Sequence, residues 1–206
     1  MGGRNERILG QGLQGRHKEE IIATKCHHLG SKKRVIASVE KSLAALKVDV
    51  IDILQLHNLK DRDSVLLDDH LEALTELRQA GKIRFTGVTT HSNMIEVIEA
   101  AVESKFYDTV LTSFNFQSPP ELARAIEKAS AANMGVIAMK IMTGGYRMEE
   151  IPGLNPYQAA LRWVLLKRSI PTTIPSIATL QQPSQNAAVM GTTTTWRDDL
   201  PPQPYA

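Results

Sequence analysis

The sequence is poor in cysteine, and this excludes several classes of site. Its 206 residues contain one cysteine, Cys26. A disulfide framework, a zinc site held by thiolates and an iron–sulfur cluster each need several cysteines, so this chain alone builds none of them. A single thiol fits a reducing, cytoplasmic setting. We expect Cys26 to be a passive thiol rather than a reactive one.

Long apolar runs and an excess of one charge are also absent. No run approaches the roughly 20 residues of a membrane span, and the polar, charged start is unlike a secretory signal. The net charge is +2 and aromatic residues make up 5% of the chain, which disfavours a nucleic-acid surface. We expect Lys32-Lys33-Arg34 to be a solvated helix end. With 42% hydrophobic residues, the chain is expected to be soluble and globular.

Short runs rich in β-branched residues recur along the chain and predict strands. Six such runs lie at 20–25, 50–57, 83–88, 108–114, 135–140 and 172–175. Apolar residues with helical spacing lie between them and predict helices over 34–46, 71–77, 95–102 and 120–129, with another after Asn155-Pro156. Ser92 and Asn93 are candidate caps for the helix over 95–102. This alternation predicts an α/β fold with a parallel sheet and right-handed crossovers.

The repeat length of about 30 residues is typical of a TIM-type (β/α)8 barrel, which needs on the order of 240 residues. Six strands after an opening helix at Asn5 to Leu13 predict an incomplete barrel, short of a strand, a helix and a strand at the front. We expect residues 1–190 to form this single partial domain and 191–206 an irregular tail. The runs at 20–25 and 172–175 would be open edges, which predicts self-association or marginal stability.

Two ionisable residues close strand-like runs. Lys25 ends the run 20–25, and His57 ends the run 50–57. Side chains at the carboxyl ends of parallel barrel strands converge on one catalytic face. We therefore predict that Lys25 and His57 lie at the same opening of the barrel as Thr89, Asn115 and Met139, which stand at the ends of later strands. Taken alone, a lysine at a strand end is more often a solvated residue than a site residue. A histidine there is as often a core residue as a site residue.

His27 and His28 do not predict a metal site. Two consecutive residues of an extended chain point to opposite sides, and neither Asp52 nor any other residue supplies a third ligand at the proper spacing. We expect no bound metal.

Seven short motifs occur in the order and spacing of the aldo-keto reductase family. They are Gly2-Gly3-Arg4-Asn5-Glu6-Arg7-Ile8-Leu9-Gly10, Ile21-Ile22-Ala23-Thr24-Lys25, Asp52-Ile53-Leu54-Gln55-Leu56-His57, Ala80-Gly81-Lys82-Ile83-Arg84, Gly87-Val88, Phe114-Asn115 and Ala160-Leu161-Arg162-Trp163-Val164-Leu165. Each motif is weak, but the ordered set is strong and spans residues 2–190. Met139-Lys140 followed by Gly144-Gly145 resembles a bacterial branch of the family.

The resemblance implies an NAD(P)(H)-dependent oxidoreductase that reduces aldehydes or ketones to alcohols by hydride transfer. Members use Asp, Tyr, Lys and His, and the motifs assign Lys25 to the lysine and His57 to the histidine that orients the carbonyl. A cation beside a phenol lowers its pKa, which suits the tyrosine to acid catalysis near neutral pH. The family's Asp and Tyr lie just upstream of Gly2-Gly3, so this sequence has neither, and we expect the chain as given to reduce carbonyls poorly.

The resemblance also implies contacts to a nicotinamide cofactor at later strand ends. The residues at the family's cofactor positions are Thr89, Thr90, Asn115, Met139, Lys140, Ser176, Gln182, Gln185 and Asn186. Met139 stands where many members stack a tyrosine on the nicotinamide. Ser176 and Gln182 stand where NADP-preferring members place lysine or arginine, so the preference for NADP(H) over NAD(H) rests on the family alone.

Two other functions stay open. A non-catalytic binding or regulatory protein on the same scaffold would sense the cofactor without turnover. An unrelated barrel, such as a phosphate-binding isomerase, would need a glycine-rich loop after its seventh or eighth strand, and Thr143-Gly144-Gly145 is a weak version of one. The small-molecule carbonyl substrate itself is left unassigned, because substrate loops vary.

Overall fold

The computed structural model describes residues 3–16, 20–27, 30–147 and 153–190. The chain divides into two compact units, Met1–Val110 and Leu111–Ala206. The division falls within strand β4 (Thr109–Ser113). A single domain over 1–190 stays a prediction, and the predicted tail at 191–206 lies outside the described residues.

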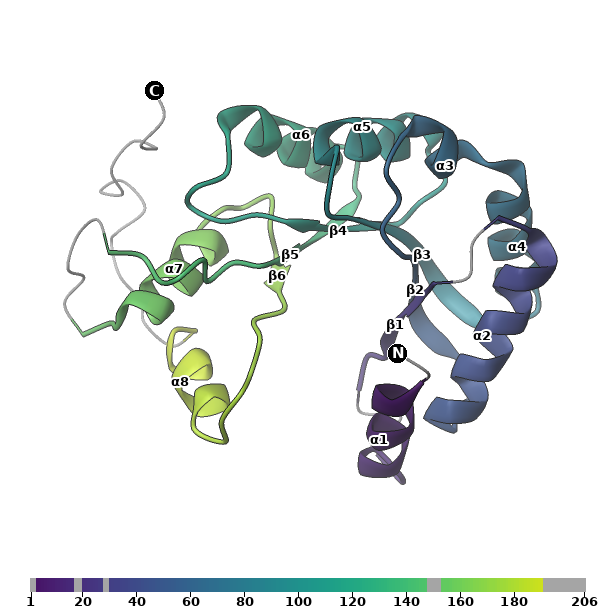
Figure 1. The fold of residues 1–206 in the computed structure, drawn as a ribbon, viewed down its shortest axis with the longest axis horizontal. Helices are drawn as coiled ribbons and strands as arrows, with labels where there is room; N and C mark the ends of the chain where they lie inside the picture. Colours follow the sequence, from purple (N-terminus) through teal and green to yellow (C-terminus); the bar gives the residue numbers. More distant parts are fainter. Residues whose placement is uncertain (1–2, 17–19, 28–29, 148–152, 191–206) are drawn as a thin grey trace. The chain divides into compact units, whose positions relative to one another are not determined.

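Helices lie between successive strands of the first unit, with two helices in a row between β2 and β3 (Figure 1). Its elements are α1 (Arg4–Gly12), β1 (Ala23–Cys26), α2 (Lys32–Leu46), β2 (Ile51–Leu56), α3 (Arg62–Leu66), α4 (Asp68–Gln79), β3 (Ile83–Thr90) and α5 (Met94–Ser104). Strand β2 pairs in parallel with β1 and with β3, so that Lys25 lies beside Gln55 and Gln55 beside Gly87. The carboxyl ends of three strands therefore lie together at one edge of this unit.

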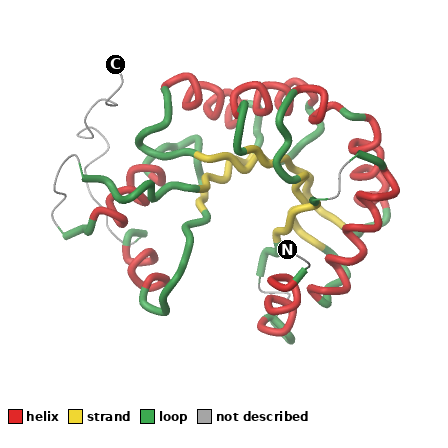
Figure 2. The backbone as a smooth tube through the Cα atoms, viewed as in Figure 1, coloured by secondary structure: helices red, strands yellow, loops and turns green. Residues whose placement is uncertain are grey.

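The second unit continues the alternation of helices and strands (Figure 2). After β4 come α6 (Pro120–Ala131), β5 (Gly135–Met139), α7 (Pro156–Leu165), β6 (Thr172–Thr173) and α8 (Gln182–Ala188). Strand β5 pairs in parallel with β6, and the strand order follows the chain from β1 to β6. The six predicted strands are confirmed. Strands β1 and β6 stand first and last in that order, and self-association through them stays a prediction.

Strand β1 begins later than predicted. The carbonyl of Ile22 accepts the N–H of Ile53 at 3.0 Å. The backbone N–H of Ile22, however, donates to the carboxylate of Asp52 at 2.9 Å. This side-chain bond takes the place of a ladder bond, so the strand starts at Ala23 and ends at Cys26. Lys25 is therefore the last residue but one of β1. His57 directly follows β2 and still donates its N–H to the carbonyl of Cys26 at 2.9 Å.

Helix α1 packs closely on the end of helix α2. A Cβ at Gly10 would lie 2.5 Å from the carbonyl oxygen of Leu46 and 2.8 Å from that of Ala45. Only glycine permits this approach. Helix α2 buries Val35, Val39, Leu43 and Leu46 of its predicted apolar stripe and leaves Ile36 half-buried. Ser31 caps the start of the helix by accepting the N–H of Arg34.

The start of α5 differs from the prediction that Ser92 or Asn93 caps it. Asn93 has a left-handed backbone (φ 48) and makes no side-chain cap. Its Nδ2 instead donates to the carbonyl of Lys60 at 2.9 Å, which ties this turn to the loop after β2. The structure also adds the short helix α3, which begins with a capping box between Asp61 and Ser64. Helix α7 begins as predicted, with Asn155 as its cap and Pro156 as its first residue.

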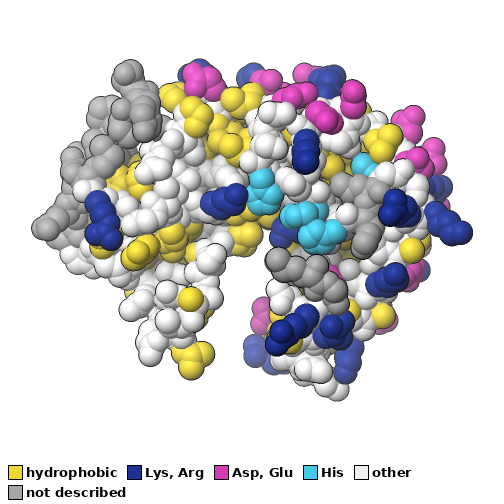
Figure 3. Space-filling model, in the orientation of Figure 1, with side chains coloured by type: hydrophobic (Ala, Val, Ile, Leu, Met, Phe, Trp, Pro, Cys, Tyr) yellow, Lys and Arg dark blue, Asp and Glu magenta, His cyan; other side chains and the backbone are white. Residues whose placement is uncertain are grey.

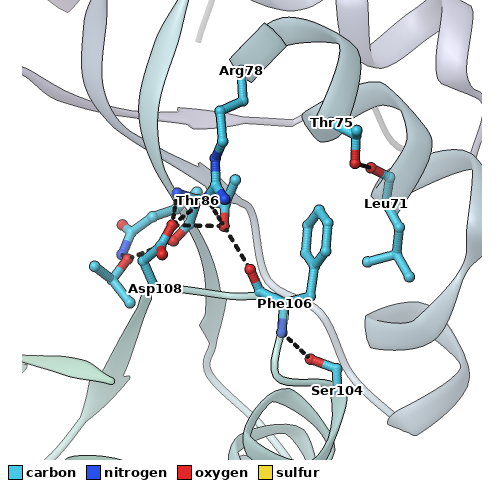
Figure 4. A network of polar contacts seen from close by, with 9 residues as sticks. Leu71, Thr75, Arg78, Thr86, Ser104, Phe106 and Asp108 are labelled. Carbon is cyan, nitrogen blue, oxygen red and sulfur yellow. Dashed lines mark hydrogen bonds and ion pairs between the residues drawn. The ribbon is translucent and has the colours of Figure 1, made fainter. Parts of the chain in front are cut away.

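A polar network holds α4, β3 and the segment before β4 together (Figure 4). The carboxylate of Asp108 accepts the N–H of Thr86 at 2.7 Å and pairs with Arg78. The Thr86 hydroxyl also accepts from the Arg78 guanidinium at 3.0 Å. These groups satisfy one another, so the network stabilises the unit and offers no reactive group. No helix in the described ranges is both long enough and apolar enough to cross a membrane.

Candidate active site

His57 and Thr89 meet at the carboxyl ends of β2 and β3. The Thr89 hydroxyl lies 3.4 Å from Nδ1 of His57 and accepts the backbone N–H of Asn58 at 2.8 Å. Thr89 is fully buried, and a buried hydroxyl proton needs an acceptor. We therefore assign Nδ1 as the acceptor and place the ring proton on Nε2. His57 then offers one N–H donor, on the side of the ring away from Thr89.

Two further histidines contact the ring of His57. The ring centroid of His27 lies 4.1 Å away, and that of His91 lies 5.8 Å away in an edge-on arrangement. Figure 3 shows histidine side chains gathered on one face. Each of the three is the first residue after a strand, since β1 ends at Cys26, β2 at Leu56 and β3 at Thr90. We call His27, His57 and His91 the histidine row.

Our sequence reasoning missed this row. It weighed His27 only as a metal ligand and did not single out His91. The repeated signal, a histidine directly after each of three consecutive strands, is readable in the sequence once the strand ends are known. Among the residues that the structure describes, no group of three or more His, Cys, Asp or Glu side chains is placed to hold a metal ion.

Burial and neighbouring basic groups lower the pKa values of Lys25 and His57. Burial lowers the pKa of Lys25 below its ordinary value. Burial, and then the positive charges of His27, His91 and Lys25, lower the pKa of His57 to about 4. His57 is therefore an uncharged imidazole at neutral pH, able to donate a hydrogen bond but not to supply a proton as a general acid.

Tyr107 does not take the place of the family's tyrosine. It is the one tyrosine in the first 110 residues of the sequence. Its hydroxyl is buried and donates to the carbonyl of Val65 at 2.7 Å, and burial raises its pKa above the ordinary range of a phenol. This phenol is a core hydrogen-bond donor.

The predicted cofactor residues of the first unit differ in their surroundings. Thr90 is buried like Thr89, but its hydroxyl donates to the carbonyl of Ser92 at 2.5 Å. It stabilises its own turn, whereas Thr89 contacts His57. Lys25, His57 and Thr89 are thus brought together. A common barrel opening with Asn115 and Met139 stays a prediction, because these two belong to the second unit.

Asn115 joins two strand ends within the second unit. Its Nδ2 donates to the carbonyl of Lys140 at 3.1 Å, and its Oδ1 accepts the N–H of Gln117 at 2.9 Å. Met139 is buried, whereas Lys140 is exposed with a left-handed backbone (φ 54). Two hydroxyls just before Asn115, those of Thr112 and Ser113, are buried without a hydrogen-bond partner. Buried hydroxyls of this kind favour a polar partner at the end of β4.

The remaining predicted cofactor residues lie in and before α8. The Oε1 of Gln182 accepts the backbone N–H groups of Ala178 and Thr179 at 2.5 and 3.2 Å. Gln182 therefore holds the loop that precedes the helix. The carbonyl of Gln185 accepts from Gln158 of α7 at 2.9 Å. Ser176 and the side chain of Gln185 are exposed, and Asn186 is half-buried.

The sequence profile of the Aldo/keto reductase family matches residues 2–151. The chain therefore belongs to this family. It is 27% identical over 226 aligned positions to the uncharacterized oxidoreductase YqkF of Bacillus subtilis (strain 168), and the alignment covers 89% of this chain and 72% of that protein. The family assignment made from the motifs is confirmed.

Two solved structures are similar in fold. The aldo-keto reductase AKR11C1 from Bacillus halodurans (holo form) has a TM-score of 0.79 at 21% identity, with 93% of this chain and 74% of that chain covered. An aldo-keto reductase from Klebsiella pneumoniae, in complex with NADPH, has a TM-score of 0.80 at 21% identity, with 95% and 73% covered. The α/β fold is thus that of an incomplete (β/α)8 barrel, with six strands among the described residues.

Proposed function

We propose that this protein is an NAD(P)(H)-dependent oxidoreductase that reduces a small aldehyde or ketone to an alcohol. The observation that carries the proposal is the placement of Lys25, His57 and Thr89 at neighbouring strand ends, with His57 held by Thr89. The family membership supports the same reaction class. A cytoplasmic location and a small-molecule substrate belong to this proposal.

In the proposed reaction His57 orients the substrate. Its Nε2–H donates to the carbonyl oxygen, which fixes the carbonyl and stabilises the negative charge that develops on that oxygen. Lys25 places a cation beside the same oxygen, and its half-burial strengthens the attraction between that cation and the oxygen by lowering the local dielectric constant. When bound, the reduced nicotinamide supplies the hydride. In these residues alone the proton that completes the alcohol comes from solvent water, because His57, whose pKa is about 4, is already uncharged at neutral pH.

The second unit carries residues that suit a nicotinamide cofactor. Asn115 offers an amide with spare hydrogen-bonding capacity for a polar ring substituent, and one of the unpaired buried hydroxyls of Thr112 and Ser113, which point to opposite faces of β4, adds a second polar group. The residues from Ser176 to Met190 include neither lysine nor arginine, so a 2′-phosphate would lack a cationic anchor there. The NADPH complex of the Klebsiella pneumoniae neighbour favours NADP(H), and we propose NADP(H) on that ground.

A second candidate is a cofactor-binding protein without catalysis. It is favoured by the fact that Tyr107, the tyrosine of the first unit, is committed to the core. Such a protein would bind the nucleotide through the same residues and would leave carbonyl compounds unchanged.

The test measures binding and turnover on the same samples. NADPH and NADH affinities are measured by fluorescence titration, and turnover is measured with methylglyoxal and 4-nitrobenzaldehyde. We expect NADPH binding, and a loss of about 10²-fold in kcat/KM for His57→Gln and Lys25→Met without a matching loss of affinity for the nucleotide. Lys41→Met, an exposed site on α2, is the control for removing a positive charge.

The outcomes separate the two functions. Failure to bind either nucleotide would exclude both. Nucleotide binding with no turnover above the uncatalysed rate of either carbonyl would favour the non-catalytic protein. Slow turnover in the unaltered chain that falls further in both His57→Gln and Lys25→Met would favour the oxidoreductase. Unchanged turnover in both His57→Gln and Lys25→Met would show that these residues are not the catalytic pair.

A further inference from the structure

We propose that His27 and His91 are positioning residues for His57, which keep its imidazole uncharged and hold its ring with Nε2 available to a carbonyl oxygen. This inference rests on the proposed function, in which His57 is the orienting donor. Its test needs no turnover, so the two can fail separately.

The topology brings the row together. Strand β2 lies between β1 and β3, and a histidine follows each strand directly. The ring of His57 therefore receives a neighbour from each adjoining strand, with centroid distances of 4.1 Å to His27 and 5.8 Å to His91. The two neighbouring planes are inclined to His57 at 51° and 74°.

These contacts restrict the ring in two ways. The neighbouring rings oppose rotation of the imidazole about its side-chain bonds, because any large rotation would move it into one of them. The hydroxyl of Thr89 then distinguishes the two ring nitrogens by occupying Nδ1. Together they leave the ring proton on Nε2.

The groups that act electrostatically on His57 are all basic. Lys25 and His27 act from the side of β1, and His91 acts from the side of β3. Each of these, when protonated, disfavours a second positive charge on His57.

The functional consequence is a donor that works over a wide pH range. Protonation of His57 would reverse its hydrogen bond with Thr89, because Nδ1–H would then donate to the Thr89 hydroxyl and the buried hydroxyl proton would lose its acceptor. By remaining uncharged, His57 keeps both the Thr89 contact and the orientation of Nε2 in mildly acidic solution. The flanking histidines thus protect a hydrogen-bond donor rather than supply a proton.

The experiment is an NMR titration of the histidine Cε1–H signals from pH 8 to pH 3.5. The chain has 6 histidines, and His57→Asn identifies the signal of His57. We expect a midpoint of about 4 for His57 in the unaltered protein. His27→Asn and His91→Asn should each raise this midpoint by about half a unit or more, the effect of a unit charge roughly 5 Å away, and the double variant should raise it further.

Two more variants separate charge from packing. His91→Phe keeps an aromatic ring and removes the charge, so it should raise the midpoint as His91→Asn does. Lys41→Met removes an exposed charge on α2 and should leave the midpoint unchanged. A midpoint near 6.5 in the unaltered protein, or one that does not move in the double variant, would overturn the inference. Absence of NADPH binding would overturn the proposed function and leave this titration intact.

Discussion

The predicted site residues of the two units contact different kinds of group. In the first unit, Lys25, His57 and Thr89 lie at the ends of paired neighbouring strands, and the side chain of Thr89 acts on another site residue. In the second unit, Asn115 and Gln182 direct their amides to backbone groups of nearby loops. In the proposed site, the first unit would therefore supply the side chains that act on the substrate, and the second would supply loops held in a fixed conformation.

This contrast follows from what each set of residues is proposed to do. A group that orients a carbonyl must have a defined protonation state, which neighbouring charges and burial set. A surface that binds a nucleotide needs loops held in one conformation before binding, so that less entropy is lost on association. Side chains such as Gln182 then act through the backbone they fix rather than by direct contact.

The largest expected effect is on the rate of carbonyl reduction, which depends on the site residues of the first unit. The family resemblance predicts an Asp and a Tyr that we did not find among these 206 residues, and loss of a general acid typically costs a factor of about 10² to 10⁴. We expect a polypeptide of these residues alone to reduce methylglyoxal at well below one turnover per second in a steady-state assay. Turnover near one per second at neutral pH would show that a group other than His57 supplies the proton.

The next effect tests whether the two units unfold together. Gly10→Ala should destabilise the protein by about 1–3 kcal/mol, because the new methyl group would meet the carbonyl of Leu46. Gly12→Ala is the matched control in the same helix, where a Cβ meets nothing within 4 Å, and it should stabilise by about 0.5–1 kcal/mol.

The readout is urea unfolding followed by far-UV circular dichroism and by tryptophan fluorescence. Both tryptophans, Trp163 and Trp196, lie beyond residue 110. If residues 1–190 form one cooperative domain, as we predict, Gly10→Ala shifts both transitions equally. A shift in the dichroism alone would mean that the units unfold separately.

A smaller effect, on NADPH affinity, is expected from a change in the loop before α8. Gln182→Ala removes the acceptor of the Ala178 and Thr179 N–H groups, and a hydrogen bond of this kind contributes about 1 kcal/mol. We expect NADPH affinity to fall about fivefold, with kcat little changed. The adjacent Gln181→Ala, at an exposed position, should leave the affinity unaltered. Equal affinity in both variants would exclude a role for this loop in nucleotide binding.

The smallest effect is a pH dependence of stability. The folded-state pKa of His57, about 4, lies below the value of about 6.5 for a histidine in an unfolded chain. Between these values the unfolded state binds more protons, so the folded state loses stability as the pH falls from about 6.5 toward 4. For a partly exposed group we expect this loss to be about 1 kcal/mol.

Urea unfolding at pH 7 and pH 4.5 measures this loss. His57→Gln should be less sensitive to the pH change than the unaltered protein by that amount. Equal sensitivity would indicate that His57 titrates normally in the folded state.

Much of the fold could be predicted because its signals are local. Runs of β-branched residues alternate with helical apolar stripes, and both periods are set by backbone geometry. The same regularity placed Lys25 and His57 at strand ends, and the family motifs named them as site residues before any coordinates were considered. Asn155-Pro156 likewise predicted the start of α7, because capping depends on a few neighbouring residues.

Tertiary structure alone decided the features that depend on distant partners. Asp52, 30 residues away from Ile22, delays the start of β1, and the carbonyl of Lys60 draws Asn93 away from capping α5. The histidine row forms because three parallel strands end side by side, which brings together residues about 30 positions apart in the chain. The sequence by itself therefore determined the six strands, most of the helices and the side chains at the strand ends, whereas the short helices α3 and α8 were not predicted. Packing between strands decided their contacts and charge states, because burial and neighbouring charges are properties of the assembled sheet.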